Sequence, residues 1–343
     1  MSATTDDDAA APDPDSVLAA FGLRGPATAV TAVGGAWSNR VYRLDAATAS
    51  FALKELLNPW AEPRWAEWLG EALSFEQRAI AAGVAAPAPV PNPADGGCLA
   101  WVTRRGGTSP AAVRLHRWVD GEPFGAGPVQ PDVAAWAGEV LATLHGLGIR
   151  PRDRSLFPVP DTSTASRWPE LTDAARRSGA EWADQLAEIG PAVSILAELA
   201  LQAGHRPEQE VMTHGDIDQK NLIATPHGPV LCDWDVAVPL VPRRELADVA
   251  LSLGCWEAFD IARDVVRSYR QAGGDDTAFE PADLGQPMMI GLDWVAFNVE
   301  RAIGLRPSGP AGAALAQGLV PELLAAVPRG LDVALRIARL MDP

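Results

Sequence analysis

The stretch VMTHGDIDQKNLIATPHGPVLCDWD, residues 211–235, is the most informative part of the chain. Its three apolar runs predict three short strands, separated first by a polar loop and then by a tight turn. Asp216 lies in the loop, Asn221 stands where the second run begins, and Asp233 follows the third run. Side-chain oxygens at strand ends suit a hard cation such as Mg²⁺, and a nearby carboxylate suits a catalytic base. Together they are the groups that phosphoryl transfer requires.

The composition indicates a chain with a substantial core. Its 343 residues suffice for two domains or one bilobal unit, and 48% of them are apolar, which argues against global disorder. The net charge of −16 argues against a nucleic-acid-binding protein, which needs a basic face. An acidic chain could bind a cationic small substrate, although acidity for solubility alone is the simpler explanation of the charge.

The sequence predicts neither a targeting segment nor a membrane-spanning segment. The N-terminal MSATTDDDAAAPDPD lacks the basic and apolar regions of a signal peptide, and no apolar stretch is long and uncharged enough to span a bilayer. Cys98, Cys232 and Cys255 form no CxxC pair and are expected to be free thiols in a reducing compartment. We therefore expect a cytoplasmic protein with no membrane partner.

The first part of the chain is expected to form a small antiparallel sheet with one helix. Residues 1–14 are acidic and rich in Pro and Ala, so we expect a disordered tail there, followed by a short helix that Ser16 caps and that ends at Phe21. The elements predicted for the rest of residues 15–119 are strands over 27–33, 41–44 and 51–56, a helix over 64–82, and strands over 98–102 and 113–119. A turn at 120–123 marks the expected boundary between two lobes.

The remainder, residues 120–343, is expected to be mostly helical around the stretch quoted above. Apolar residues recur at helical spacing in several segments, and a long irregular segment separates the first two of these. The predicted helices span residues 131–147, 184–203, 244–269, 286–303 and 321–341, the last with a break at Pro328.

The pattern HGDxxxxN from His214, followed by DWD from Asp233, resembles the aminoglycoside phosphotransferase and choline kinase families, which share the protein-kinase-like fold. The resemblance extends roughly from Val30 to Ile303. It implies an α+β, bilobal fold with a small antiparallel-sheet N-lobe and a mostly helical C-lobe. It also implies transfer of the γ-phosphoryl group of ATP, with Mg²⁺, to a hydroxyl of a small molecule such as an aminoglycoside or another amino sugar. Two alternatives are a metabolic kinase of the choline or homoserine type and a nucleotide-binding pseudokinase without transfer.

The resemblance assigns roles to the polar residues of the stretch. Asp216 would be the catalytic base that orients the acceptor hydroxyl, while Asn221 and Asp233 would hold Mg²⁺ on the phosphates. Asp235 would support the metal site. His214 would pack and form hydrogen bonds beneath the loop rather than take part in the chemistry.

Lys54 and Lys220 are the only lysines among 28 basic residues, which suggests a need for a compact point charge at one or both positions. Lys54 lies on the third predicted strand, where the resemblance implies contacts to the α- and β-phosphates and an ion pair with a helix carboxylate. Glu71 and Glu76 are both candidates for that carboxylate, and Glu76 is favoured because it shares the apolar face of its helix. Lys220 is expected to be exposed.

Further nucleotide contacts are implied by the same resemblance. The turn GGAWSN, residues 34–39, would face the β- and γ-phosphates with its backbone N–H groups and the side chain of Ser38 or Asn39. The strand before the predicted lobe boundary matches the hinge of the family. There the adenine edge would bond the backbone C=O of Arg117 and N–H of Val119.

Two other motifs fit the family as structural supports, since Leu144-His145 would pack beneath the catalytic loop and Asp248 would brace it. Recognition of the acceptor is less well defined. Acids that alternate with aromatic residues on the C-terminal helices could line a pocket for an amino sugar or a quaternary amine, or could be ordinary solvated faces. These acids are Glu257, Asp260, Asp293 and Glu300.

Overall fold

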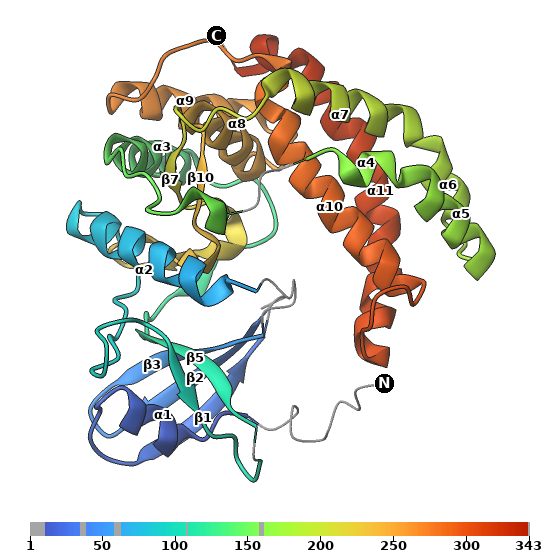
Figure 1. Cartoon of the computed structure of the whole chain (residues 1–343). Coiled ribbons are helices and arrows are strands. Elements are labelled where there is room, and N and C mark those ends of the chain that lie inside the picture. The colour runs from blue at the N-terminus through green and yellow to red at the C-terminus, as the bar shows by residue number, and fades with distance from the viewer. Residues whose placement is uncertain (1–10, 35–38, 58–62, 108, 158–160, 342–343) are drawn as a thin grey trace. The chain divides into compact units, whose positions relative to one another are not determined.

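The computed structural model describes residues 11–34, 39–57, 63–107, 109–157 and 161–341 (Figure 1). The chain forms two compact units, and neither is continuous in sequence. The first unit comprises residues 1–125, 151–157 and 220–238, and the second unit comprises residues 126–150, 158–219 and 239–343. The sequence predicted two continuous lobes, residues 15–119 and 120–343. In the structure, the segment with Asn221 and Asp233 belongs to the first unit instead.

A five-stranded antiparallel sheet forms the centre of the first unit. Its strand order is β1 (Ala27–Val33), β2 (Asn39–Ala46), β3 (Ser50–Leu56), β5 (Ala111–Arg117) and β4 (Ala100–Val102). The predicted three-strand meander is therefore confirmed. Lys54 on β3 lies opposite Arg114 on β5, and Leu53 lies opposite Leu115. Because opposed residues point to the same face, one face carries the two cations and the other carries the apolar pair.

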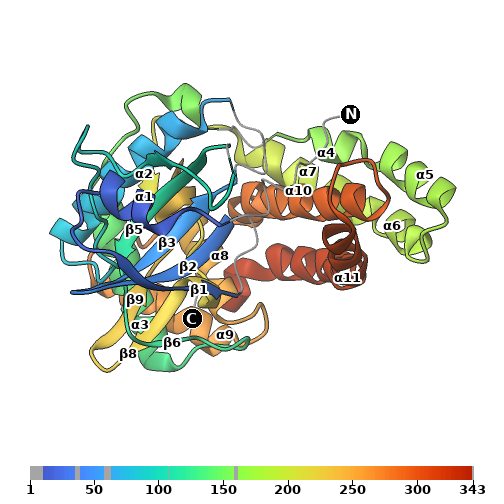
Figure 2. The same ribbon diagram turned by 90° about the horizontal axis from the view of Figure 1, so that it is seen from below.

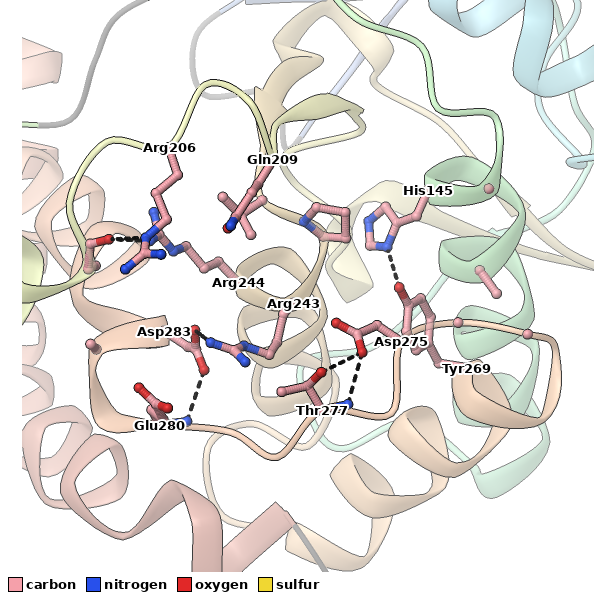
Figure 3. A pocket seen from close by; sticks show the side chains of 18 of the residues that line it. His145, Arg206, Gln209, Arg243, Arg244, Tyr269, Asp275, Thr277, Glu280 and Asp283 are labelled. Carbon is pink, nitrogen blue, oxygen red and sulfur yellow. Dashed lines mark hydrogen bonds and ion pairs between the residues drawn. The ribbon is translucent and has the colours of Figure 1, made fainter.

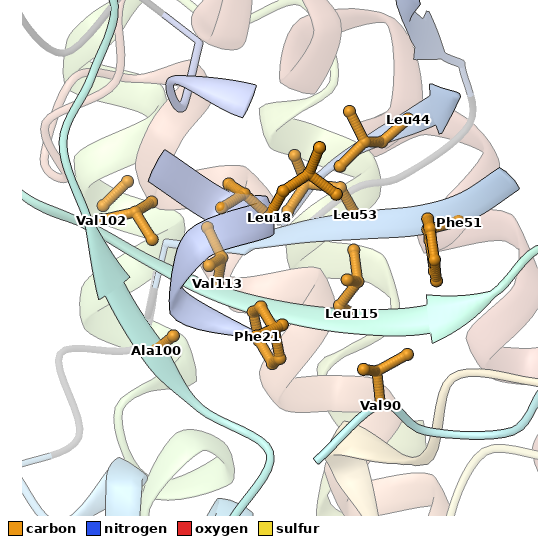
Figure 4. Close-up of a cluster of buried hydrophobic side chains, with 12 residues drawn as sticks. Leu18, Phe21, Leu44, Phe51, Leu53, Val90, Ala100, Val102, Val113 and Leu115 are labelled. Carbon is orange, nitrogen blue, oxygen red and sulfur yellow. The ribbon is translucent and has the colours of Figure 1, made fainter. Parts of the chain in front are cut away.

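The apolar face of this sheet supports the core of the first unit (Figure 4). Helix α1 (Pro14–Ala20) contributes Leu18 to that core, with Phe21 directly after the helix. The cap of α1 is Asp13 rather than Ser16, because the Asp13 carboxylate accepts the N–H of Ser16 (2.9 Å). The N–H of Asp13 donates to the carbonyl of Thr103 (2.8 Å), so the end of the expected tail is part of the fold.

Helix α2 (Trp65–Ala81) confirms the predicted helix of the first unit, and Glu76 lies on its buried face. Strands β8 (Leu222–Thr225) and β9 (Gly228–Leu231) form the predicted hairpin, and β6 (Glu122–Pro123), expected as a turn, pairs with β8. The N–H of Leu231 also donates to the carbonyl of Ala85 (2.9 Å). These backbone hydrogen bonds explain why the hairpin belongs to the first unit.

Helices dominate the second unit. They are α3 (Pro131–Gly146), α4 (Ser163–Ser166), α5 (Trp168–Ser178), α6 (Ala183–Glu188), α7 (Gly190–Ala203), α8 (Pro242–Leu253), α9 (Phe259–Gln271), α10 (Gly285–Ala302) and α11 (Pro310–Met341). A two-stranded sheet of β7 (Val211–Thr213) and β10 (Val238–Leu240) accompanies them. Helices α10 and α11 lie side by side (Figures 1 and 2), and each has fully buried residues such as Val299 and Leu324. In the part of the chain described, no helix is both long and apolar enough to cross a membrane.

Two of the predicted helices are each divided in the structure. Segment 184–203 forms α6 and α7, and segment 244–269 forms most of α8 and most of α9. The second break lies at Gly254, where a Cβ would be 2.6 Å from the carbonyl oxygen of Ala258. A side chain there would collide with backbone, so the sharp turn depends on glycine.

Two other predictions for the second unit are corrected. Pro328 does not break α11, which runs through it. A proline removes one backbone hydrogen bond, and the buried Val327 and Leu331 keep the helix packed on either side. Helix α5 lies in the segment expected to be irregular, although Pro169 near its start and Gly179 after its end are the usual signals of a helix.

Close packing of α3 on α9 depends on Gly138. A Cβ at Gly138 would lie 2.3 Å from the carbonyl oxygen of Val265 and 2.7 Å from the backbone nitrogen of Tyr269. We expect Gly138→Ala to lower the free energy of unfolding by about 1–3 kcal/mol, because α9 must move away. Urea denaturation measures this change.

Gly291 provides the control, because it is also a helical glycine of the second unit, but a Cβ added to it would meet no atom within 4 Å. Gly291→Ala should stabilise the protein by about 0.5–1 kcal/mol. Equal effects of the two substitutions would show that the α3–α9 contact is not the cause.

Candidate active site

Lys54 on β3 contacts two carboxylates that follow β9. Its Nζ lies 2.5 Å from Oδ2 of Asp235 and also forms an ion pair with Asp233. The side chains of Lys54 and Asp235 are 12% and 7% exposed, whereas that of Asp233 is 34% exposed. The structure therefore brings the predicted lysine together with both aspartates of the DWD pattern, and Asp233 is the most accessible of the three.

The partners of Lys54 correct one prediction. Glu76, which the sequence favours over Glu71 as the partner of Lys54, is bonded instead to Nη2 of Arg114 (2.6 Å), and Arg114 also forms an ion pair with Asp235. The cause is the sheet register, because Arg114 lies opposite Lys54 and its planar guanidinium can bridge two carboxylates. Glu76 is thus linked to Lys54 only indirectly. We call Lys54, Glu76, Arg114, Asp233 and Asp235 the charge cluster.

Burial and charge together set the protonation of the charge cluster. Burial by itself would raise the pKa of Glu76, but the hydrogen bond with His116 (3.0 Å) and the charge of Arg114 hold that pKa below its ordinary value. Burial lowers the pKa of His116, so this imidazole is neutral at pH 7. The cluster then contains three carboxylates and two cations, which leaves a net charge of −1.

The residues around Asp233 fit a divalent cation. Asn221 directly precedes β8 and Asp233 follows β9, so the hairpin brings both to one end, where the N–H of Cys232 donates to the carbonyl of Asn221 (2.9 Å). The carboxylate of Asp233 and the side-chain oxygen of Asn221 are of the kind that Mg²⁺ takes together with phosphate oxygens. Asn221 is buried, at 4% exposure. The described residues contain no group of three or more His, Cys, Asp or Glu side chains that could hold a metal.

The backbone of Asp233 has a left-handed conformation, with φ 65° and ψ 55°. Few residues other than glycine adopt this conformation, and Asp and Asn are among those that tolerate it best. Aspartate at position 233 therefore tolerates the left-handed backbone and also provides a carboxylate of the kind that binds cations.

Asp216 lies in the second unit, in the loop after β7. His214 is fully buried, and its Nδ1 accepts the N–H of Asp216 (3.3 Å). His214 therefore supports the loop from below. Asp216 itself is half-buried, and Lys220 is exposed as expected.

Helix α8 holds this loop at both ends, which was not predicted from the sequence. Near the first end, Oε1 of Glu245 accepts the N–H of Gly215 (2.7 Å). At the other end, Nε2 of Gln219 donates to the carbonyl oxygen of Ser252 (3.0 Å). The available signal was a carboxylate, Glu245, among the mainly apolar residues that follow it in α8, since a buried carboxylate requires partners.

The other predicted nucleotide contacts stay predictions. Ser38 lies outside the described residues. Asn39 begins β2, and its Oδ1 accepts the N–H of Leu57 (3.2 Å). Arg117 ends β5, with its N–H bonded to a backbone carbonyl (2.8 Å), and Val119 lies just beyond the strand.

The acids suggested for acceptor binding have different surroundings. Glu257 and Asp260 are exposed. Oδ1 of Asp293 accepts the hydroxyl of Thr164 (2.5 Å). Glu300 forms an ion pair with Arg306 (3.0 Å). Two of the four acids are thus solvated, and two have partners within the second unit.

A cavity of about 670 Å³ lies in the second unit (Figure 3). His145, Arg206, Arg243 and Tyr269 contribute to its wall. Its lining includes none of the residues predicted to bind nucleotide or metal or to act as the base. The cavity is nevertheless connected to the loop of Asp216, because Nε2 of His145 lies 2.6 Å from Oε2 of Glu245.

A family comparison agrees with this arrangement of residues. A model of the phosphotransferase enzyme family matches residues 29–282, well over half of the 343 residues. The chain belongs to this family. The match includes Lys54, Asp216, Asn221 and Asp233. This protein is therefore an enzyme, a phosphotransferase, as the resemblance implied. No curated protein sequence matches it.

Several solved structures share the fold of this phosphotransferase. Spectinomycin phosphotransferase, in complex with ADP and spectinomycin, has a TM-score of 0.66 and 11% identity, over 89% of this chain and 94% of that chain. A microcompartment-associated aminopropanol kinase has a TM-score of 0.64 and 18% identity, over 94% and 98%. A choline/ethanolamine kinase family protein from Mesorhizobium loti has a TM-score of 0.51 and 20% identity, over 94% and 98%. The expected α+β, kinase-like fold is confirmed.

Proposed function

We propose that this phosphotransferase moves the γ-phosphoryl group of ATP to a hydroxyl of an amine-bearing small molecule, with an aminoglycoside or another amino sugar as the leading candidate. The charge cluster is the observation that supports this most strongly. In it, Lys54 lies against Asp233 and Asp235, beside the hairpin end that carries Asn221. Phosphoryl transfer depends mainly on positioning and electrostatic stabilisation, and a lysine fixed beside the accessible carboxylate of Asp233 supplies both.

Each residue has a proposed part in the reaction. Lys54, fixed by Asp235, would bind oxygens of the α- and β-phosphates. Asn221 and Asp233 would hold Mg²⁺, which neutralises phosphate charge when bound. Asp216 would accept the proton of the acceptor hydroxyl as its oxygen attacks the γ-phosphorus, and ADP would leave.

Two considerations favour an acceptor with a positive charge. The net charge of −16 gives the protein a field that attracts cations. Proteins of similar fold include a spectinomycin phosphotransferase, an aminopropanol kinase and a choline kinase. A metabolic kinase of the choline type is the second candidate, because the choline/ethanolamine kinase family protein has the highest identity of the three structures compared above, 20%.

A screen of purified protein tests the proposal. ATP consumption and phosphorylated product are measured with aminoglycosides, other amino sugars, aminopropanol, choline and homoserine, for the wild type and for a variant without the Asp216 carboxylate. Product with an amino sugar supports the leading candidate, and product with choline alone supports the second. A thermal shift with Mg·ATP but no product on any acceptor would instead indicate a pseudokinase.

Asp233→Asn should separate nucleotide binding from the base chemistry. Asparagine tolerates the left-handed backbone of this position but removes the negative charge that Asp233 would contribute to binding the cation. We expect the affinity for Mg·ATP, measured by calorimetry, to fall by roughly 10- to 100-fold. Asp120→Asn is the control, because the Asp120 side chain is 91% exposed on the same unit. Unchanged Mg·ATP affinity in Asp233→Asn would exclude Asp233 as a ligand.

A further inference from the structure

Glu245 is a buried carboxylate with two well-defined partners. Its side chain is 3% exposed. Oε1 accepts the N–H of Gly215 (2.7 Å), and Oε2 lies 2.6 Å from Nε2 of His145. Burial by itself would raise the pKa of Glu245, but the hydrogen bonds with His145 and Gly215 hold that pKa below its ordinary value. The carboxylate is therefore ionised and depends on both donors.

The hydrogen bonds extend from Glu245 through His145 to the cavity, and Figure 3 shows the one between His145 and Tyr269. Nδ1 of His145 lies 3.0 Å from the hydroxyl of Tyr269. Burial raises the pKa of Tyr269 to about 12, so its O–H stays protonated beside His145. The ionised carboxylate of Glu245 can only accept hydrogen bonds, so Nε2 of His145 donates to it. His145 therefore links the wall of the cavity to Glu245.

The two peptide groups before Asp216 are held by different side chains. Glu245 holds the N–H of Gly215, and His214 holds the N–H of Asp216. Gly215 has a φ of 79°. Glycine adopts this conformation readily, but it also populates many others, because no side chain restricts its backbone. Without an external partner this residue could change conformation easily, and the carboxylate of Asp216 would change direction with it.

We infer that Glu245 is a positioning residue for Asp216: it fixes the peptide group of Gly215 and thereby the direction of the Asp216 carboxylate. His145 acts through Glu245 by its hydrogen bond with Oε2, and Tyr269 in turn holds the ring of His145. The inference rests on the proposed role of Asp216 as the base. Glu245 lies about one turn before Asp248 in α8. The family resemblance assigns the support of the loop to Asp248, and the inference adds Glu245 to it.

Glu245→Ala and Glu245→Gln test the inference. Glu245→Ala should lower kcat by roughly 10- to 100-fold, as expected for a misdirected base, and leave the KM for ATP unchanged. Amide hydrogen exchange at Gly215 should become roughly 10- to 100-fold faster. Glu245→Gln should restore most of both properties, because the amide oxygen can accept from Gly215 while the amide N–H donates to the other tautomer of His145.

Asp283→Asn is the matched control, because Asp283 is also a buried carboxylate of the second unit, 4% exposed and 2.9 Å from Arg243. It should change neither kcat nor exchange at Gly215. Unaltered exchange at Gly215 in Glu245→Ala would overturn the inference, and so would a kcat equal to that of the wild type. If the wild type phosphorylates no acceptor, the proposed function fails, whereas exchange at Gly215 still decides whether Glu245 holds the loop.

Discussion

Asp216→Asn is expected to lower kcat for phosphoryl transfer by roughly 10²- to 10⁴-fold. The substitution preserves the size of the side chain but removes the group that would take the proton of the acceptor hydroxyl. Asp216 has no proposed contact with the nucleotide or the cation, so binding of Mg·ATP should be unaffected. Initial rates with an acceptor from the screen give kcat, and a thermal shift with Mg·ATP gives nucleotide binding.

Asp218→Asn is the control for this experiment. Asp218 lies two residues further along the same loop and is also half-buried, but it has no proposed part in the reaction. Its variant should have a kcat close to that of the wild type. A small loss in Asp216→Asn would contradict the assignment of the base, and equal losses in both variants would mean that the loop tolerates no change of charge.

Arg114→Met should lower the free energy of unfolding by about 3–5 kcal/mol. The Arg114 side chain is fully buried and bonded to Glu76 and Asp235. Methionine is also long and flexible, but it leaves two buried carboxylates without their shared cation. The midpoint of urea denaturation measures the loss, and the affinity for Mg·ATP should fall as well, because Asp235 also contacts Lys54.

Two further variants show whether charge is the cause. Arg78→Met changes an exposed arginine of α2 and should alter stability by less than about 0.5 kcal/mol. Arg114→Met combined with Glu76→Met removes both members of a buried ion pair and should recover part of the stability lost in Arg114→Met alone. Glu76→Met alone completes the cycle. If the double variant shows the sum of the losses in Arg114→Met and Glu76→Met, packing rather than charge pairing explains the result.

Much of the fold could be predicted from local sequence patterns. The strands around Lys54 alternate in polarity, and the hairpin after Asn221 contains its own turn signal. The errors arose where distant contacts override local preference. Pro328 stays helical because α11 is packed on both sides of it, and the hairpin joins the first unit through hydrogen bonds with residues more than a hundred positions earlier.

The sequence predicted which residues belong to the candidate site, but it did not predict which of them form ion pairs with one another. The HGDxxxxN and DWD patterns, through their resemblance to a family, select the candidate base and cation ligands, and these roles stay predictions. Whether Glu76 meets Lys54 or Arg114 depends on the register of β3 and β5, which one sequence does not define. Glu245 was missed for a similar reason. It accepts the backbone N–H of Gly215, and every residue except proline has such an N–H, so the sequence does not indicate this contact.

The three separate segments of the first unit have a consequence for the order of events during synthesis. Arg114 and Asp235 are 121 residues apart, and Lys54 and Asp233 are 179 residues apart. A growing chain on the ribosome can form the five-stranded sheet long before these aspartates emerge. Domains generally fold as they are made, but here Lys54 and Arg114 must wait for Asp233 and Asp235 while much of the second unit is translated, and only Glu76 is available to Arg114 before then. The first unit is therefore complete only after the hairpin and the two aspartates that follow it have been made.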